Sequence, residues 1–245
     1  MNSAELKKLV GTTVVDQEVK SGMRLGMGTG STALWAMRRI AELLADGTLK
    51  DLYIVPTSFQ TKIELETLGF KTCSLNDPEV DGRIDLAIDG ADEVDPDFRL
   101  IKGGGAAHTQ EKLVEYQAER YVIIVDESKL VENLGLNFLL PLEVIPEARR
   151  VVTQKLQALG AQVELRAAAK KAGPVITDNG NLILDARFPQ GIAQTMNMPL
   201  PQCEALLRSF VGVLEIGLFT RQVDAVYVGR AQGGVDVLTP REQRG

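Results

Sequence analysis

The hydrophobic positions in the first half of the chain follow two alternating spacings. In some stretches apolar residues recur every three or four positions, and in others they form short unbroken runs. The helical spacing predicts helices at 4–20, 31–45, 58–68 and 109–118, and the short runs predict strands at 23–27, 51–55, 84–88 and 121–125. Strands separated by single helices form βαβ units, so the pattern predicts a mainly parallel sheet with helices on both faces.

The pattern changes after about residue 132. It predicts strands at 141–145, 163–165 and 182–186, a helix at 148–159 and a turn-rich stretch at 170–181. This order indicates a small α+β subdomain. A helix at 202–210 and strands at 225–228 and 235–238 are expected to rejoin the first domain. The predicted division is 1–133 with 207–245 for the larger domain and 134–206 for the smaller one.

Composition removes several classes of site. The chain has 245 residues, of which 44% are hydrophobic and 24% charged, as in an ordinary globular protein. Its single histidine, His108, excludes sites with two or more imidazole ligands. Cys73 and Cys203 are too far apart in sequence for a zinc ribbon, a CxxC pair or a disulfide framework.

Charge and hydropathy set the expected surroundings. The net charge of −6 argues against a basic nucleic-acid surface as the main function. Residues 1–10 have no apolar core of a signal peptide, and no apolar run approaches the length of a membrane span. We therefore expect a cytoplasmic protein that binds neither nucleic acid nor membranes.

A glycine-rich segment, residues 26–33 (GMGTGSTA), lies between a predicted strand and a predicted helix. Glycines let an anion approach the backbone, and the helix N-terminus offers amides and a favourable dipole. The same glycines fit a loose dinucleotide fingerprint, but residues 54–58 lack the acidic residue that a dinucleotide site needs there. The segment thus favours a small phosphorylated ligand over NAD. The alternative is a tight turn in which Ser31 caps the helix.

An acidic segment, residues 89–95, follows the predicted strand 84–88 directly. The carboxyl ends of strands in an open parallel sheet face the ligand crevice. For Asp89 and Asp92 two interpretations stay open, namely Mg²⁺ coordination and hydrogen bonding to sugar hydroxyls with proton transfer. For Glu93, Asp95 and Asp97 we expect a solvated acidic turn.

A third segment combines a lysine with a glycine run, Lys102 followed by 103–105. Thr109 is a candidate N-cap for the next helix, and Glu111 lies in its first turn, where a carboxylate favours the helix dipole whatever its function. Lys129 lies in a polar loop after the strand 121–125. Each signal is weak alone, and their shared position after successive strands gives them weight. His108 is not placed in the catalytic set.

Together these segments resemble ribose-5-phosphate isomerase of the A type. The similar stretches, in chain order, are 28–33, 89–93, 102–107 with Glu111 and Lys112, 125–129, 212–219 and 225–229. The resemblance covers essentially the whole chain, with local departures at His108 and Ile216. It implies an α/β fold with a Rossmann-like, mainly parallel sheet, a smaller α+β subdomain, and a homodimer.

The resemblance also implies an activity and a site. The family interconverts ribose 5-phosphate and ribulose 5-phosphate with no metal and no organic cofactor. Glu111 would be the general base, Lys102 would stabilise the enediolate, and Asp89 would open the ring and move hydroxyl protons. The implied substrate-binding residues are Thr29, Gly30, Ser31, Thr32, Asp89, Gly90, Ala91, Asp92, Lys102, Gly103, Gly104, Gly105 and Lys129. The alternatives are a non-catalytic sugar-phosphate sensor domain and a nicotinamide-dependent enzyme.

Overall fold

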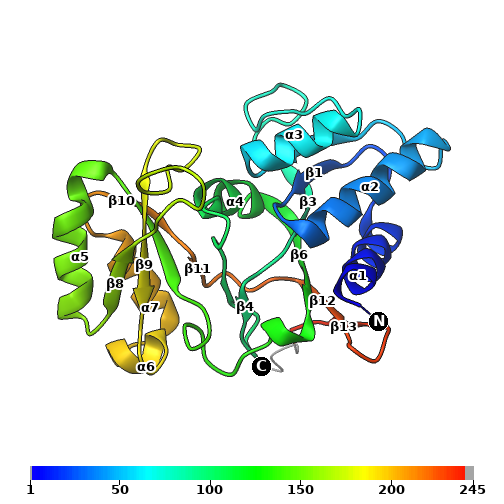
Figure 1. Ribbon diagram of the computed structural model, residues 1–245. Coiled ribbons are helices and arrows are strands. Elements are labelled where there is room, and N and C mark those ends of the chain that lie inside the picture. Colours follow the sequence, from blue (N-terminus) through cyan, green and yellow to red (C-terminus); the bar gives the residue numbers. More distant parts are fainter. Residues whose placement is uncertain (1, 241–245) are drawn as a thin grey trace. The chain divides into compact units, whose positions relative to one another are not determined.

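The computed structural model describes residues 2–240, which form two compact units. The first unit contains the chain up to Gly90, residues 110–128, and the chain from Val223 onward. The second unit contains Ala91–Thr109 and Lys129–Gln222. Figure 1 labels most of the helices and strands of both units.

A six-stranded sheet forms the centre of the first unit. Its strand order is β13-β12-β6-β3-β1-β2, and every neighbouring pair is parallel except β12 with β13. The strands are β1 (Arg24–Met27), β2 (Tyr53–Pro56), β3 (Ile84–Asp89), β6 (Ala118–Asp126), β12 (Ala225–Gly229) and β13 (Val235–Leu238). Parallel pairing of β1 with β3 brings the ends of these two strands to the same edge of the sheet.

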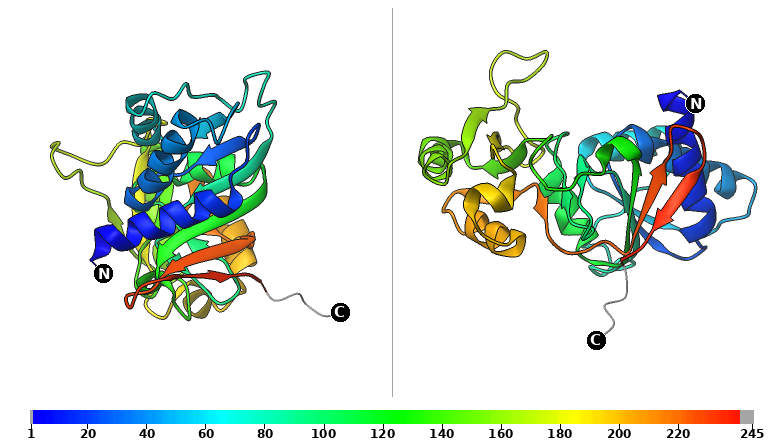
Figure 2. Two further views of the ribbon diagram at one scale, coloured as in Figure 1. Left: turned by 90° about the vertical axis from the view of Figure 1, so that its right-hand side faces the viewer. Right: turned by 90° about the horizontal axis from the view of Figure 1, so that it is seen from below.

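Helices cover both faces of this sheet. The helices α1 (Ser3–Glu18) and α2 (Ser31–Ala45) pack side by side, and they lie in front of the strands in the left view of Figure 2. Leu25 and Met27 of β1 join the core that these two helices form with the sheet. Between them, Gly26 faces the other way and meets Val114 of α4 (His108–Glu115). The helix α3 (Phe59–Thr67) follows β2.

The second unit contains two small antiparallel sheets. One has the order β10-β7-β9-β8 and the other β11-β5-β4. Their strands are β4 (Glu93–Val94), β5 (Leu100–Ile101), β7 (Leu140–Val144), β8 (Gln162–Leu165), β9 (Leu182–Arg187), β10 (Val213–Ile216) and β11 (Leu218–Phe219). The helices α5 (Arg149–Ala158), α6 (Ile192–Met196) and α7 (Leu200–Arg208) share one apolar core with the four-stranded sheet. Short 3₁₀ segments lie at Glu127–Lys129 and Pro146–Ala148.

The predicted α/β class, with a mainly parallel sheet and a separate α+β part, is confirmed. The predicted helix 109–118 is too long, because Ala118 already pairs with Ile84 as the first residue of β6. The strands β4, β5, β10 and β11 and the short helix α6 were not predicted. No helix in the described part of the chain combines the length and apolar character needed to span a membrane.

The compact units divide the chain differently from the predicted domains. Residues 91–109, 129–133 and 207–222, which the sequence assigned to the larger domain, belong to the second unit. Strand pairing explains the difference, because β5 pairs with β11 and β10 pairs with β7.

Candidate active site

The glycine loop of the first unit leads from β1 into α2. Gly30 occupies the N-cap position with φ +113°, so Ser31 is the first helical residue and the interpretation of Ser31 as N-cap is wrong. The Ser31 side chain instead accepts a hydrogen bond from Nζ of Lys7 at 2.9 Å. A helix N-terminus with an adjacent ammonium group is a favourable place for an anion such as phosphate.

Hydroxyl groups from the β2–α3 connection fix this loop. The Thr29 hydroxyl donates to Oγ of Ser58 at 2.7 Å and lies 3.0 Å from that of Thr61 and 3.2 Å from that of Thr57. Thr61 in turn donates to the carbonyl of Gly28 at 3.0 Å. These hydroxyls stand where a dinucleotide-binding protein carries its ribose-binding carboxylate, in agreement with the sequence argument against NAD.

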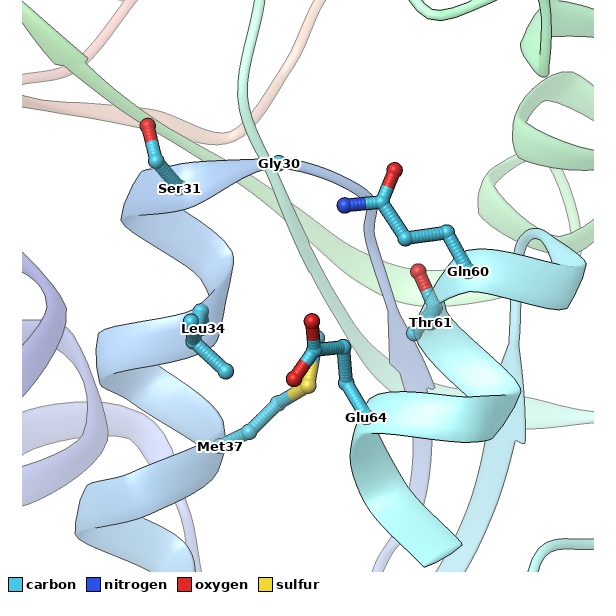
Figure 3. A pocket seen from close by; sticks show the side chains of 7 residues that line it. All are labelled: Gly30, Ser31, Leu34, Met37, Gln60, Thr61 and Glu64. Atoms are coloured by element: carbon cyan, nitrogen blue, oxygen red, sulfur yellow. The ribbon is translucent and has the colours of Figure 1, made fainter. Parts of the chain in front are cut away.

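A pocket of about 150 Å³ opens beside the loop (Figure 3). Gly30, Ser31, Leu34 and Met37 line it from α2 and the loop before it, and Gln60, Thr61 and Glu64 line it from α3. Its α2 wall is apolar at Leu34 and Met37, and Glu64 brings a negative charge. The inside of this pocket is therefore a less favourable place for an anion than the helix end near Lys7.

Asp89 ends β3 and lies against the same loop. Its side chain is buried, and Oδ1 accepts hydrogen bonds from the amides of Thr29 at 3.0 Å and Gly90 at 2.7 Å. A Cβ at Gly28 would lie 1.9 Å from the Asp89 carboxyl group, so this position requires glycine. The structure thus brings the first and second predicted motifs into direct contact.

Glu111 lies in the first turn of α4, as the spacing predicts, but its side chain is only 6% exposed. Thr109 is not the N-cap of α4, because the helix already begins at His108. The Thr109 hydroxyl donates instead to the buried carboxylate of Glu143. A carboxylate removed from water is a stronger candidate for a general base than a solvated one at a helix start.

Lys102 and the glycine run 103–105 both belong to the second unit. Asp92 accepts a hydrogen bond from the amide of Gly104 at 2.8 Å. Burial raises the pKa of Asp92, while the Gly104 bond and the positive charges of Lys102, Lys129 and Arg166 act in the opposite direction. Asp92, the glycine run and three cations therefore form one electrostatic cluster.

Lys102 is buried with 2% exposure, which is rare for a lysine. Its backbone amide donates to the carbonyl of Gly217 at 2.9 Å, and its ammonium group lies 5.7 Å from the ring centre of Phe219. A Cβ at Gly217 would lie 2.2 Å from the Lys102 carbonyl oxygen, so only glycine permits this approach. The strand β11 and its preceding glycine therefore position Lys102.

The expectation of a solvated turn is wrong for Glu93 and Asp95. The Glu93 carboxylate is buried and accepts hydrogen bonds at 2.6–2.8 Å from the amides of Gly135, Asn137 and Phe138. Burial raises the pKa of Glu93, and these bonds partly offset the effect. Asp95 is buried against Arg99, while Asp97 is 65% exposed.

His108 is buried within the second unit. The buried His108 ring lies with Nε2 3.3 Å from the carbonyl oxygen of Glu215, and a Cβ at Gly103 would lie 2.6 Å from its Nδ1. These two contacts are typical of a packing residue. Among residues 2–240, no cluster of three or more His, Cys, Asp or Glu side chains is arranged to hold a metal ion.

Sequence reasoning missed Lys7, the β2–α3 hydroxyls and Arg166. Lys7 lies 24 residues from Ser31, so nothing local links the two. The hydroxyls of Thr57, Ser58 and Thr61 had a sequence signal, since they follow a predicted strand in a short stretch where Phe59 is the one apolar residue.

The first unit has the architecture of Rossmann-like α/β proteins, which bind phosphorylated ligands at the carboxyl edge of a parallel sheet. Residues 53–233 match the family model of ribose 5-phosphate isomerase A (phosphoriboisomerase A). The chain belongs to this family.

Relatives match over nearly the whole length. A ribose-5-phosphate isomerase A of Synechococcus sp. (strain WH7803) is 49% identical, with 98% of each chain covered. A solved D-ribose-5-phosphate isomerase in complex with phospho-erythronic acid is 41% identical, with a TM-score of 0.91 over 98% of this chain and 100% of that chain. The ribose 5-phosphate isomerase of Plasmodium falciparum is 33% identical, with a TM-score of 0.89 over 96% of this chain and 98% of that chain.

Proposed function

We propose that the protein interconverts D-ribose 5-phosphate and D-ribulose 5-phosphate, an aldose–ketose isomerisation of the non-oxidative pentose phosphate pathway. The observation that carries the proposal is full-length similarity to isomerases of this name, with every motif of the resemblance present. The relative with bound phospho-erythronic acid adds chemical support, since a carboxylate next to a hydroxyl-bearing carbon resembles an enediolate.

The proposed reaction proceeds through an enediolate. Glu111 takes the proton from C2 of the open-chain aldose and returns it to C1, while a hydroxyl proton moves from O2 to O1. Lys102 stabilises the negative charge that develops on these oxygens, and its burial strengthens the interaction. Asp89 opens the sugar ring and moves hydroxyl protons, and Asp92 holds the sugar. The proposal invokes no metal and no organic cofactor.

The phosphate of the substrate is proposed to bind at residues 29–32, where the α2 N-terminus and Lys7 supply amides and positive charge. Lys129 and the backbone of Gly90, Ala91 and 103–105 complete the proposed substrate-binding set. Binding energy from the phosphate orients the reacting carbons, because contacts remote from the reacting atoms help to hold them in place.

A coupled assay for ribulose 5-phosphate formation tests the proposal, with Glu111→Gln as the key variant and the exposed Glu119→Gln as the matched control. Removal of a general base is expected to lower kcat by about 10²–10⁴-fold. Near-wild-type turnover by Glu111→Gln would exclude it as the base. Loss of wild-type activity in EDTA would favour metal coordination by Asp89 and Asp92.

We further propose a cytoplasmic homodimer. We propose residues 211–219 as part of its contact: Val211 is 85% exposed and Leu214 is 48% exposed, whereas Leu218 and Phe219 are buried in the fold. Apolar side chains at such exposure suit a contact with a second copy. Sedimentation of the wild type and of Val211→Asp tests the dimer, and a monomeric wild type would refute it. Cell fractionation tests the location.

A further inference from the structure

Arg166 holds the glycine run 103–105 from the side opposite Asp92. Its Nη1 donates to the carbonyls of Gly103 at 2.9 Å and Gly104 at 3.1 Å. In a trans peptide the C=O and N–H groups point in opposite directions. The Gly103–Gly104 peptide is therefore fixed at both edges, by Arg166 at its oxygen and by Asp92 at its N–H.

Asp185 fixes Arg166 in turn. Nε of Arg166 donates to Oδ2 of Asp185 at 2.7 Å, and Nη2 donates to Oδ1. The two side chains are only 15% and 8% exposed. A bidentate ion pair of this kind sets the plane of the guanidinium, so the remaining nitrogen, Nη1, presents its hydrogens in one direction. Arg166 thus acts as a rigid support for the loop.

The loop itself has little freedom except at its outer edge. Gly103 has φ +100° and no room for a Cβ, because His108 would lie 2.6 Å away. Gly104 and Gly105 are exposed, and a Cβ at Gly105 would meet nothing within 4 Å. Because the Gly104 carbonyl points to Arg166, the N–H of Gly105 points away from Arg166.

We propose that Arg166, held by Asp185, is a positioning residue for the isomerase reaction: it orients the glycine run so that Asp92 and the Gly105 amide meet the sugar. Arg166 acts through these groups and does not touch the substrate. The inference rests on the proposed function, which places Asp92 and 103–105 on the substrate.

The decisive variant is Arg166→Lys, which keeps the charge but cannot span two carboxylate oxygens and two carbonyls at once. Asp185→Asn weakens the support while keeping the guanidinium. Arg187→Met is the matched control, since Arg187 is exposed on the same strand, β9. The measurements are kcat and KM for ribose 5-phosphate, binding of phospho-erythronic acid and of inorganic phosphate by calorimetry, and thermal unfolding.

For Arg166→Lys we expect kcat/KM to fall roughly tenfold to hundredfold, in line with the cost of a displacement near 1 Å. Phospho-erythronic acid should bind roughly tenfold more weakly, while inorganic phosphate, bound by residues 29–32, should keep its affinity within about twofold. Asp185→Asn should show the same pattern with a smaller loss, and it carries the test if Arg166→Lys does not fold. Arg187→Met should match the wild type.

Two results would overturn the inference. One is a folded Arg166→Lys protein whose kcat/KM stays within about threefold of the wild type. The other is a lower unfolding temperature with unchanged kcat and analogue binding, which would show a purely structural role. Failure of the proposed function is distinguishable, because the wild type itself would then show no turnover of ribose 5-phosphate.

Discussion

Substitution of Gly28 by alanine tests whether the position of the Asp89 carboxylate matters. The added Cβ would lie 1.9 Å from Cγ and Oδ1 of Asp89 and 2.4 Å from its Cβ. Ordinary contacts begin at 3.4 Å, so the carboxylate must move by about 1.5 Å. This shift also breaks its hydrogen bonds with the amides of Thr29 and Gly90.

The displacement sets the size of the expected effect. A misplacement of about 1 Å near the reacting groups costs on the order of 100-fold in rate. We therefore expect kcat/KM for ribose 5-phosphate to fall by at least about 100-fold, which corresponds to about 2.7 kcal/mol. Overpacking is expected to lower the free energy of unfolding by about 1–3 kcal/mol as well.

Gly47→Ala separates these two effects. Gly47 lies after the other end of α2, has φ +81° and leaves open space for a Cβ. Its substitution should cost about 1–2 kcal/mol of stability through backbone strain and leave kcat/KM unchanged. The double variant Gly28→Ala/Asp89→Asn should lose little more than Asp89→Asn alone, because both changes act on one carboxylate. A folded Gly28→Ala protein within about threefold of wild-type kcat/KM would refute the reasoning.

Two further predictions concern Lys7 and Glu143. Lys7→Met should lower kcat/KM roughly tenfold through weaker phosphate binding, while the neighbouring Lys8→Met, whose ammonium lies over Trp35, should not; equal values for both variants would contradict the role of Lys7. Burial alone would raise the pKa of Glu143, but its side-chain hydrogen bonds lower the pKa below the ordinary value of 4.5. In the acid range the unfolded chain therefore binds more protons than the folded one. The free energy of unfolding should thus fall as the pH drops below about 4.5. Glu143→Gln should flatten this acid limb in urea unfolding series, and an unchanged slope would rule out Glu143 as its source.

The larger part of the fold could be predicted from local spacing. The strands β1, β2, β3 and β6 contain short apolar runs, and the helices between them follow the period of 3.6, within segments of 4–15 residues. The strands β4, β5 and β11 have two residues each, which is too short to show any period. They exist because Glu93 and Leu218 both pair with Ile101, and residues 218 and 101 are far apart in the chain.

For the acidic residues after β3, the sequence alone could not predict which carboxylates are buried. Position after a strand set Asp89 and Asp92 apart from the other acids, because strand ends in a parallel sheet share one edge, and the structure places Asp89 at the end of β3. Position alone could not separate Glu93 from Asp97, which have the same local chemistry. Glu93 is buried because residues 135–138 supply three amides to it, 42 to 45 positions further along the chain, whereas Asp97 remains exposed.

Residue spacing was enough to predict the α/β class, the two motifs that follow β1 and β3, and the resemblance to one isomerase family. Each of these depends on residues close together in the chain or on the order of short motifs along it. The third motif, Lys102 with the glycine run, follows the antiparallel strand β5 and not a strand of the parallel sheet. The burial of the charged groups, the cation beside the glycine loop 28–31 and the support of the glycine run 103–105 depend on the tertiary structure. Lys7 contacts Ser31 across 24 residues and Arg166 contacts Gly103 across 63, and only the packing of the folded chain brings such pairs within hydrogen-bond distance.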